Sequence, residues 1–331
     1  MTVIFRIFIL GLLIIGFGQA GVSQTDYALV IHGGAGNIAR ESISPEQERE
    51  YHEKLQEALL AGEELLKNGG TSLDAVEAAI RILEDSPLFN AGRGAVFTSE
   101  GNNELDASIM CGATLNAGAV AGITTLRHPV SAARKVMEVS PHVMLIGKGA
   151  EQFGYEQGLE VVDPSWFFDQ RRWEQYREFL RRQQMRGAID SNDKMGTVGA
   201  VALDTHGNLA AATSTGGMTG KQYGRVGDVP VIGAGTYANN ATCAVSATGH
   251  GEFFIRYVVS HEISSLMRYR GASLDEAAGE LINQTLKDAG GNGGVIAIDH
   301  QGNISMPFNT TAMFRGYIKS DGSRLVKIFA E

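Results

Sequence analysis

Several residue types and patterns are scarce in this 331-residue chain, and each absence excludes a class of protein. Two cysteines, Cys111 and Cys243, are too few for a disulfide framework, and their disulfide state stays open. Only 7 prolines accompany 42 glycines, with no G-X-Y period, which excludes collagen. A net charge of −9 without a basic run among aromatics argues against a nucleic-acid partner. No H-E-x-x-H or C-x-x-C pair supports a zinc site.

The residues that are abundant predict a globular protein. Hydrophobic residues make up 44% of the chain and charged residues 20%, a balance that can bury a sizeable core. Glycine is in excess, which indicates tight turns and backbone that approaches another group closely.

An apolar run near the N-terminus predicts a targeting segment. IFILGLLIIGF occupies residues 7–17 behind Arg6, and the small residues Gly18 and Ala20 follow. This is the order of a signal peptide, and the run is shorter than the ~20 residues that span a bilayer. We therefore expect residues 1–20 to be a cleaved signal peptide, with no stable membrane anchor and export to the periplasm or the medium. An uncleaved anchor is the alternative.

The predicted elements come in blocks of strands and helices, which favours antiparallel sheets covered by helices. A strand is expected at residues 27–31, and capped helices begin at Ser44 and Thr71. Two more helices are expected near residues 251–268 and 273–287.

Two segments carry more specific expectations. Residues 198–215 and 295–308 share the pattern V-x-A-[LI]-D-x-x-G-N, which predicts two similar hairpins in one sheet. Residues 151–194 are rich in Arg, Glu, Gln and aromatics and end in a polar run, so we interpret them as a surface linker outside the core.

A threonine at the start of a predicted strand is the first candidate catalytic residue. Thr197 follows Gly196, and by position alone a β-branched residue that opens a strand explains it. A hydroxyl nucleophile needs a base, and the chain has no G-x-S-x-G elbow. If the bond between these residues were cut, the new α-amine, with a reference pKa of about 7.7–8.0, would serve as that base.

Other polar residues suit the binding of a small zwitterion. Arg225 and Asp228 have two interpretations. They form either a surface ion pair that contributes little stability, or a clamp in which the Arg225 guanidinium binds a ligand carboxylate and the Asp228 carboxylate binds a ligand ammonium. Thr248 and Gly249 offer a hydroxyl and a backbone N–H to an oxyanion. HGGAG at residues 32–36 lacks the spacing of a phosphate loop, which favours a tight turn or backbone lining a site.

Six segments together resemble the plant-type asparaginase and isoaspartyl peptidase family of N-terminal-nucleophile hydrolases. The resemblance runs from about residue 27 to the C-terminus and is weaker over 151–194. The segments are IHGGAGNI at 31–38, PLFNAGRGAVF at 87–97, ELDASIM at 104–110, GTVGAVALD at 196–204, TSTGGMTGKQYGRVGDVPVIGAGTYANN at 213–240 and ATGHGEFFIR at 247–256.

The resemblance implies a fold of the α/β (α+β) class, a four-layer αββα sandwich. It also implies self-cleavage between Gly196 and Thr197. An α subunit (residues 21–196) and a β subunit (residues 197–331) would then form one domain and assemble as an (αβ)₂ heterotetramer. Thr197 would be the nucleophile and its amine the base, with Thr215 assisting.

Further roles are carried over from the family by motif. Thr248 and Gly249 would form the oxyanion hole and, with His250 and Gly251, join Arg225 and Asp228 in binding substrate. Family members often have threonine at the position of His250, which leaves its effect on substrate range open. A structural sodium ion is implied, without a catalytic cofactor. Its loop would contain Leu83, Glu84, Phe89, Asn90 and Ala91.

The implied activity is removal of β-linked aspartyl residues from isoaspartyl peptides and hydrolysis of L-asparagine to aspartate and ammonia. Asparagine and isoaspartyl dipeptides both stay candidate substrates. One alternative is a glycosylasparaginase acting on N-linked GlcNAc-asparagine, although its members typically have Asp where Gly196 stands. Another is an exported binding protein that captures amino acids and is never cut.

Overall fold

The computed structural model describes residues 26–186 and 196–330 as one polypeptide. The expected signal peptide, residues 1–20, lies outside the described residues. Within the described ranges, no helix is both long enough and apolar enough to cross a membrane.

The strands of the described chain form two sheets. An eight-stranded sheet has the order β12-β11-β1-β5-β6-β2-β3-β4, and a four-stranded sheet has the order β10-β9-β8-β7. Adjacent strands are antiparallel except β3 and β4, which are parallel. The strands are β1 (Ala28–Gly36), β2 (Leu105–Cys111), β3 (Ala117–Ile123), β4 (Met144–Ile146), β5 (Val198–Leu203), β6 (Leu209–Thr215), β7 (Thr236–Ala238), β8 (Cys243–Gly249), β9 (Gly293–Asp299), β10 (Ile304–Ser305), β11 (Ala312–Lys319) and β12 (Arg324–Phe329).

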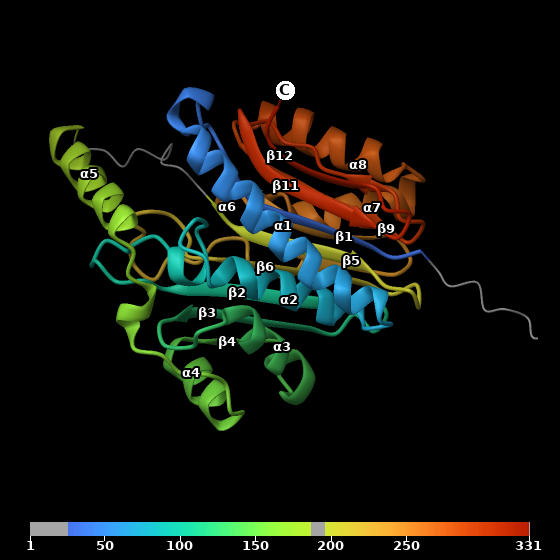
Figure 1. Ribbon diagram of the computed structural model, residues 1–331, viewed down its shortest axis with the longest axis horizontal. Coiled ribbons are helices and arrows are strands. Elements are labelled where there is room, and N and C mark those ends of the chain that lie inside the picture. Colours follow the sequence, from blue (N-terminus) through green and yellow to red (C-terminus); the bar gives the residue numbers. More distant parts are fainter. Residues whose placement is uncertain (1–25, 187–195, 331) are drawn as a thin grey trace, which may run out of the picture.

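Helices cover the outer face of each sheet (Figure 1). The eight-stranded sheet is covered by α1, α2 and α3, and the four-stranded sheet by α6, α7 and α8. The helices are α1 (Pro45–Lys67), α2 (Ser72–Glu84), α3 (Pro129–Val139), α4 (Gly147–Glu156), α5 (Gln170–Arg186), α6 (Gly251–Arg256), α7 (Val259–Arg270) and α8 (Leu274–Glu280), with a π-helical turn at Leu281–Leu286 and 3-10 turns at Arg40–Ser42, Gly92–Gly94 and Pro164–Phe167.

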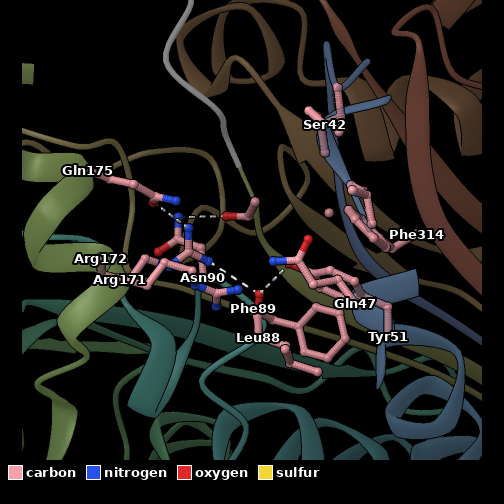
Figure 2. Close-up of a pocket in the computed structure, with 15 residues that line it drawn as sticks. Ser42, Gln47, Tyr51, Leu88, Phe89, Asn90, Arg171, Arg172, Gln175 and Phe314 are labelled. Carbon is pink, nitrogen blue, oxygen red and sulfur yellow. Dashed lines mark hydrogen bonds between the residues drawn. The ribbon is translucent and has the colours of Figure 1, made fainter. Parts of the chain in front are cut away.

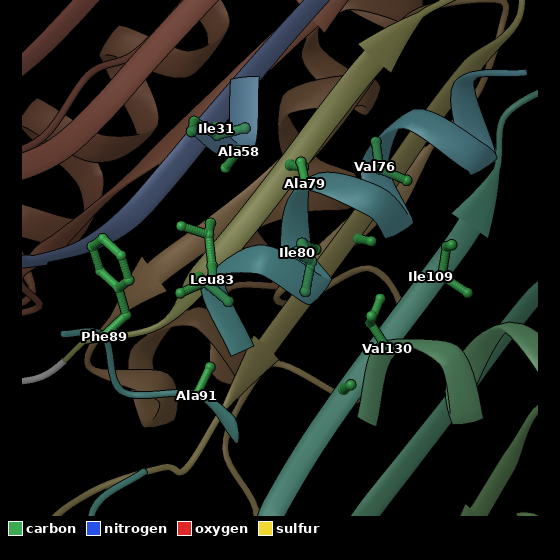
Figure 3. Close-up of a cluster of buried hydrophobic side chains, with 14 of the residues drawn as sticks. Ile31, Ala58, Val76, Ala79, Ile80, Leu83, Phe89, Ala91, Ile109 and Val130 are labelled. Atoms are coloured by element: carbon green, nitrogen blue, oxygen red, sulfur yellow. The ribbon is translucent and has the colours of Figure 1, made fainter. Parts of the chain in front are cut away.

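Three apolar clusters fill the spaces between the four layers. Because side chains alternate along a strand, Ile31 of β1 packs under the helices and Val30 faces the other sheet. Figure 3 shows the first cluster, in which Ile80 and Leu83 of α2 lie over the strands. The second cluster, which includes Val30, lies between the two sheets. The third cluster lies between the four-stranded sheet and its helices. The prediction of a four-layer αββα sandwich is confirmed.

Helix starts follow the capping signals in the sequence. Ser44 caps α1 and Thr71 caps α2, each through a reciprocal capping box. The helix expected over 251–268 is instead broken, because Val258 adopts a left-handed conformation (φ 49°) between α6 and α7. The helix expected over 273–287 forms but changes to a π-helical turn at residue 281.

The two similar hairpins lie in different sheets, so the expectation of one shared sheet is wrong. β5 and β6 belong to the eight-stranded sheet, and β9 and β10 to the four-stranded one. Their common pattern encodes the turn: Asp204 accepts hydrogen bonds from the backbone N–H groups two and four residues on, and Asp299 does the same.

The described part of the expected linker is folded, which corrects the interpretation of 151–194 as surface linker. Helix α4 packs on β3, and α5 follows after a 3-10 turn whose Phe167 is fully buried. Tyr176 and Phe179 of α5 pack around Phe97. Because this segment has many charged residues, its apolar face was not recognised in the sequence. Residues 187–194 lie outside the described ranges.

Candidate active site

Thr197 lies at the start of β5, in the middle of the eight-stranded sheet, and is still joined to Gly196. Its side chain is buried, and its hydroxyl donates a hydrogen bond to Thr215 Oγ1 at 3.1 Å. Thr215 in turn donates to the Gly196 carbonyl at 3.3 Å and accepts the Gly217 N–H. The hydroxyl of Thr215 therefore links the hydroxyl of Thr197, the candidate nucleophile, to the carbonyl oxygen of Gly196 at the predicted cleavage site.

Asn90 provides a second donor to that carbonyl. Its Nδ2 lies 2.8 Å from the oxygen of Gly196 (Figure 2). The same Nδ2 lies 2.7 Å from the oxygen of Gly217, and Oδ1 accepts the Val96 N–H. Two donors on one carbonyl polarise it and would stabilise an oxyanion formed there. The sequence analysis missed this contact, which joins residues 106 positions apart.

His32 holds the main chain of Thr197 from β1. Its Nδ1 lies 3.0 Å from the Thr197 carbonyl, which can only accept, so Nδ1 carries the proton and Nε2 accepts the hydroxyl of Ser246. Burial lowers the pKa of His32 to about 3 and keeps it neutral. A Cβ on Gly199 would lie 2.2 Å from Nε2, so glycine is required there.

The glycine-rich end of β1 passes directly beside the bond between residues 196 and 197. Gly34 has φ +111°, and a Cβ there would lie 2.8 Å from Gly196 Cα and 3.1 Å from Thr197 N. A bulge between His32 and Gly34 permits this path. The HGGAG segment is therefore strand backbone lining a site, one of its two interpretations, and not a tight turn.

Thr248 and Gly249 end β8 close to this strand. Thr248 Oγ1 accepts the N–H of Ala35 at 3.2 Å, which leaves the proton of its hydroxyl free to be donated. Gly249 has φ +155°, and a Cβ there would lie 2.4 Å from the Asn292 carbonyl. The two residues predicted for the oxyanion hole therefore lie beside the strand that contacts Thr197.

Arg225 and Asp228 converge on Gly251. A Cβ on Gly251 would lie 2.8 Å from Asp228 Oδ1 and 2.9 Å from Arg225 Nη2. Arg225 forms a two-pronged ion pair with Glu252, 3.0 Å at each contact, while His250 Nε2 lies 3.3 Å from the same carboxylate. The interpretation as a simple surface ion pair between Arg225 and Asp228 is wrong, because Glu252 is the partner and Asp228 is buried.

The Asp228 carboxyl is suited to binding a cation. Burial raises its pKa from 3.8 to about 7, Glu252 and Asp106 add to this, and Arg225 opposes it. Its Oδ2 is buried and has no hydrogen-bond partner among the described residues. An ammonium at Oδ2 and a carboxylate that displaces Glu252 from Arg225 would satisfy both ends of a zwitterion.

The residues expected around a sodium ion run from the last two residues of α2 into the loop that follows. The carbonyl oxygens of Glu84 and Phe89 face Gly92 and Gly94, where a Cβ would lie 2.3 and 2.0 Å from them. Backbone carbonyls are hard oxygen ligands, so this cradle fits a hard cation. The metal-binding side chains of the described residues nowhere cluster in threes.

Asn90 was expected in the same loop, and its role near a sodium ion stays a prediction. Its Oδ1 accepts the Val96 N–H, its backbone oxygen accepts the Gly216 N–H, and its Nδ2 donates to the Gly196 carbonyl.

Asn90→Asp tests the polarisation of that carbonyl. Aspartate keeps the size of the side chain and the acceptor for Val96 but has no N–H donor. We expect self-cleavage to slow by about 10²- to 10³-fold, the usual effect of losing one oxyanion donor. The accumulation of the two fragments on a denaturing gel measures it, with Asn68→Ala, an exposed change at the end of α1, as control. An unchanged rate in Asn90→Asp would contradict the assignment.

Comparison with known proteins adds independent evidence. The family model described as Asparaginase matches residues 25–328. The chain is 54% identical over 294 residues to an isoaspartyl peptidase of Escherichia coli, covering 87% of this chain and 92% of that protein. It is 42% identical to a plant-type L-asparaginase of Pyrococcus abyssi (88% and 96% covered) and 39% identical to a probable isoaspartyl peptidase/L-asparaginase of Arabidopsis thaliana (92% and 99%). The chain therefore belongs to the asparaginase family.

Proposed function

We propose that the chain is a self-cleaving threonine hydrolase that removes β-linked aspartyl residues from isoaspartyl peptides and hydrolyses L-asparagine. The observation that carries this proposal is the arrangement at the bond between Gly196 and Thr197, where the hydroxyl of Thr197 contacts Thr215 and the carbonyl of Gly196 receives two donors. The names of the relatives support the same activity.

Self-cleavage begins when Thr197 Oγ attacks the carbonyl carbon of Gly196. Asn90 and Thr215 stabilise the oxyanion, the C–N bond breaks, and the hydroxyl proton goes to the departing nitrogen, which becomes the amine of Thr197. Water then hydrolyses the Gly196 ester and releases the Thr197 hydroxyl. The products are the α subunit, which ends at residue 196, and the β subunit, residues 197–331.

Turnover uses the new terminus. The amine of Thr197 takes the proton from Oγ, which attacks the side-chain carbonyl of a β-aspartyl group. Thr248 and Gly249 stabilise the oxyanion, and Arg225 and Asp228 hold the α-carboxylate and α-ammonium. The amine returns the proton to the leaving nitrogen, and water hydrolyses the ester to release aspartate. Nucleophile and base belong to one residue, so this sequence of steps needs no catalytic cofactor.

Three further features belong to the proposal. A structural sodium ion held by the loop of Leu83, Glu84, Phe89, Asn90 and Ala91 would steady this side of the site. Two αβ pairs would assemble as a heterotetramer, and the N-terminal segment would direct export before its removal.

The substrate class is tested by incubating fully cleaved protein with L-asparagine, β-Asp-Leu and GlcNAc-Asn and measuring released aspartate. We expect asparagine and β-Asp-Leu to be hydrolysed, and Thr197→Ala protein to release nothing. Hydrolysis of GlcNAc-Asn alone would show a glycosylasparaginase. Binding of amino acids by uncut protein, without release of ammonia, would show a binding protein.

A further inference from the structure

A cavity of ≈ 180 Å³ borders Gly196. Figure 2 shows its arrangement: Arg171, Arg172 and Gln175 approach from α5, while Tyr51 and Phe314 lie opposite. Neither Thr197 nor the clamp residues line this cavity. It is therefore separate from the site that would hold the aspartyl group, yet it begins at the bond that self-cleavage breaks.

The chemistry of turnover directs the leaving group into this space. The amine of Thr197 must return a proton to the leaving nitrogen, so that nitrogen has to lie beside Thr197 N. In the uncut chain, the neighbour of Thr197 N is Gly196, and Gly34 packs against both. The place that Gly196 vacates after cleavage adjoins Thr197 N and opens into the cavity that Gly196 lines.

The polar end of the cavity carries positive charge. Arg172 is half-buried, and its guanidinium donates hydrogen bonds to the carbonyls of Gly94 (2.8 Å) and Leu88 (3.4 Å) and to the side chain of Gln175 (3.1 Å). Burial lowers the pKa of Arg172 to about 10, which keeps it charged at neutral pH.

Arg171 has guanidinium N–H donors that make no hydrogen bond among the described residues. Its side chain is 35% exposed, and among the described residues it donates one hydrogen bond, to the Pro87 carbonyl, and lies 3.9 Å from Asp169. A guanidinium has five N–H donors and matches a carboxylate in two-pronged geometry.

The opposite wall combines apolar side chains with the polar side chains of Ser42 and Gln47 (Figure 2). Phe89 and Phe314 pack edge to face and line the cavity together with Ile43. A side chain such as that of leucine would remove apolar surface from water against this wall.

We propose, on the basis of the function proposed above, that this cavity is the subsite for the leaving residue of an isoaspartyl dipeptide, with Arg171 binding the C-terminal carboxylate of that residue. The preferred substrates are then β-aspartyl dipeptides with an apolar second residue and a free carboxylate. L-Asparagine, which releases ammonia, does not reach the cavity.

The test compares kcat/KM, per cleaved Thr197, for β-Asp-Leu, β-Asp-leucinamide and L-asparagine. Wild-type enzyme should prefer the dipeptide to its neutral amide by about tenfold to a hundredfold, the worth of hydrogen bonds to a charged group. In Arg171→Gln, this preference should disappear, and the ratio of dipeptide to asparagine hydrolysis should fall by the same factor. Arg181→Gln, an arginine on α5 that is 66% exposed and pairs with Glu178, is the matched control and should keep both ratios.

Equal hydrolysis of dipeptide and amide by the wild-type enzyme would overturn the subsite, and this comparison depends on no variant. Unchanged ratios in cleaved Arg171→Gln would overturn the role of Arg171. Failure of the proposed function gives a different result: fully cleaved wild-type protein would hydrolyse neither asparagine nor β-Asp-Leu.

Discussion

Thr197→Ala is expected to remain a single uncut chain without hydrolytic activity, a loss on the order of 10⁶-fold. Alanine removes the hydroxyl that contacts Thr215, and with it the attacking atom of both self-cleavage and turnover. Intact mass and a denaturing gel measure the cut, and ammonia release from asparagine measures turnover. Thr197→Ser keeps a hydroxyl and an α-amine, so it should still cut and turn over, more slowly.

The matched control for this substitution is Thr114→Ala. Thr114 lies exposed in the turn between β2 and β3, where its hydroxyl accepts the Asn116 N–H. This variant should be cut and should turn over like the wild type. Cleavage of Thr197→Ala between residues 196 and 197 would contradict attack by this hydroxyl.

Asp228→Asn is expected to lower kcat/KM for asparagine by about a hundredfold to a thousandfold, because it removes the charged partner of the substrate ammonium. In the wild type, Asp228 must be ionised to bind that ammonium, and its pKa is raised to about 7. The kcat/KM of the wild type should therefore fall as the pH drops below about 7. A profile of kcat/KM against pH for both proteins measures this, and equal activity of Asp228→Asn would contradict the clamp.

The same substitution should stabilise the fold at high pH. The folded protein keeps a proton on Asp228 up to about pH 7, whereas the unfolded chain releases it near 3.8. This group therefore costs stability as pH rises from about 4 to 7, and the cost persists above that range. Neutral asparagine avoids it, so we expect Asp228→Asn to raise the free energy of unfolding by about 1–3 kcal/mol at pH 8. Denaturant unfolding at pH 4 and pH 8 measures this gain, which should be small at pH 4.

Local signals predicted much of the fold. The caps at Ser44 and Thr71 placed two helices, and the hairpin turns at Asp204 and Asp299 placed four strands. The assignment of those hairpins to sheets was wrong, because turn chemistry is local whereas sheet membership depends on long-range packing. The break at Val258 has no Gly or Pro to mark it in the sequence.

In the candidate site too, local motifs predicted some residues, whereas the long-range contacts were not predicted. Thr197, Arg225 and Thr248 were found because they lie in motifs of the family. The contacts of Asn90 with Gly196 and of His32 with Thr197 were missed, since each joins residues more than a hundred positions apart. The pairing of Arg225 with Glu252 was missed as well, although both residues lie in recognised segments.

N-terminal sequencing of the purified, catalytically active protein, with intact mass on the same sample, tests the central claim most directly. We predict a chain that begins T-V-G-A-V and has the mass of residues 197–331. Full turnover of asparagine and β-Asp-Leu by material in which residue 197 is not a chain terminus would contradict it.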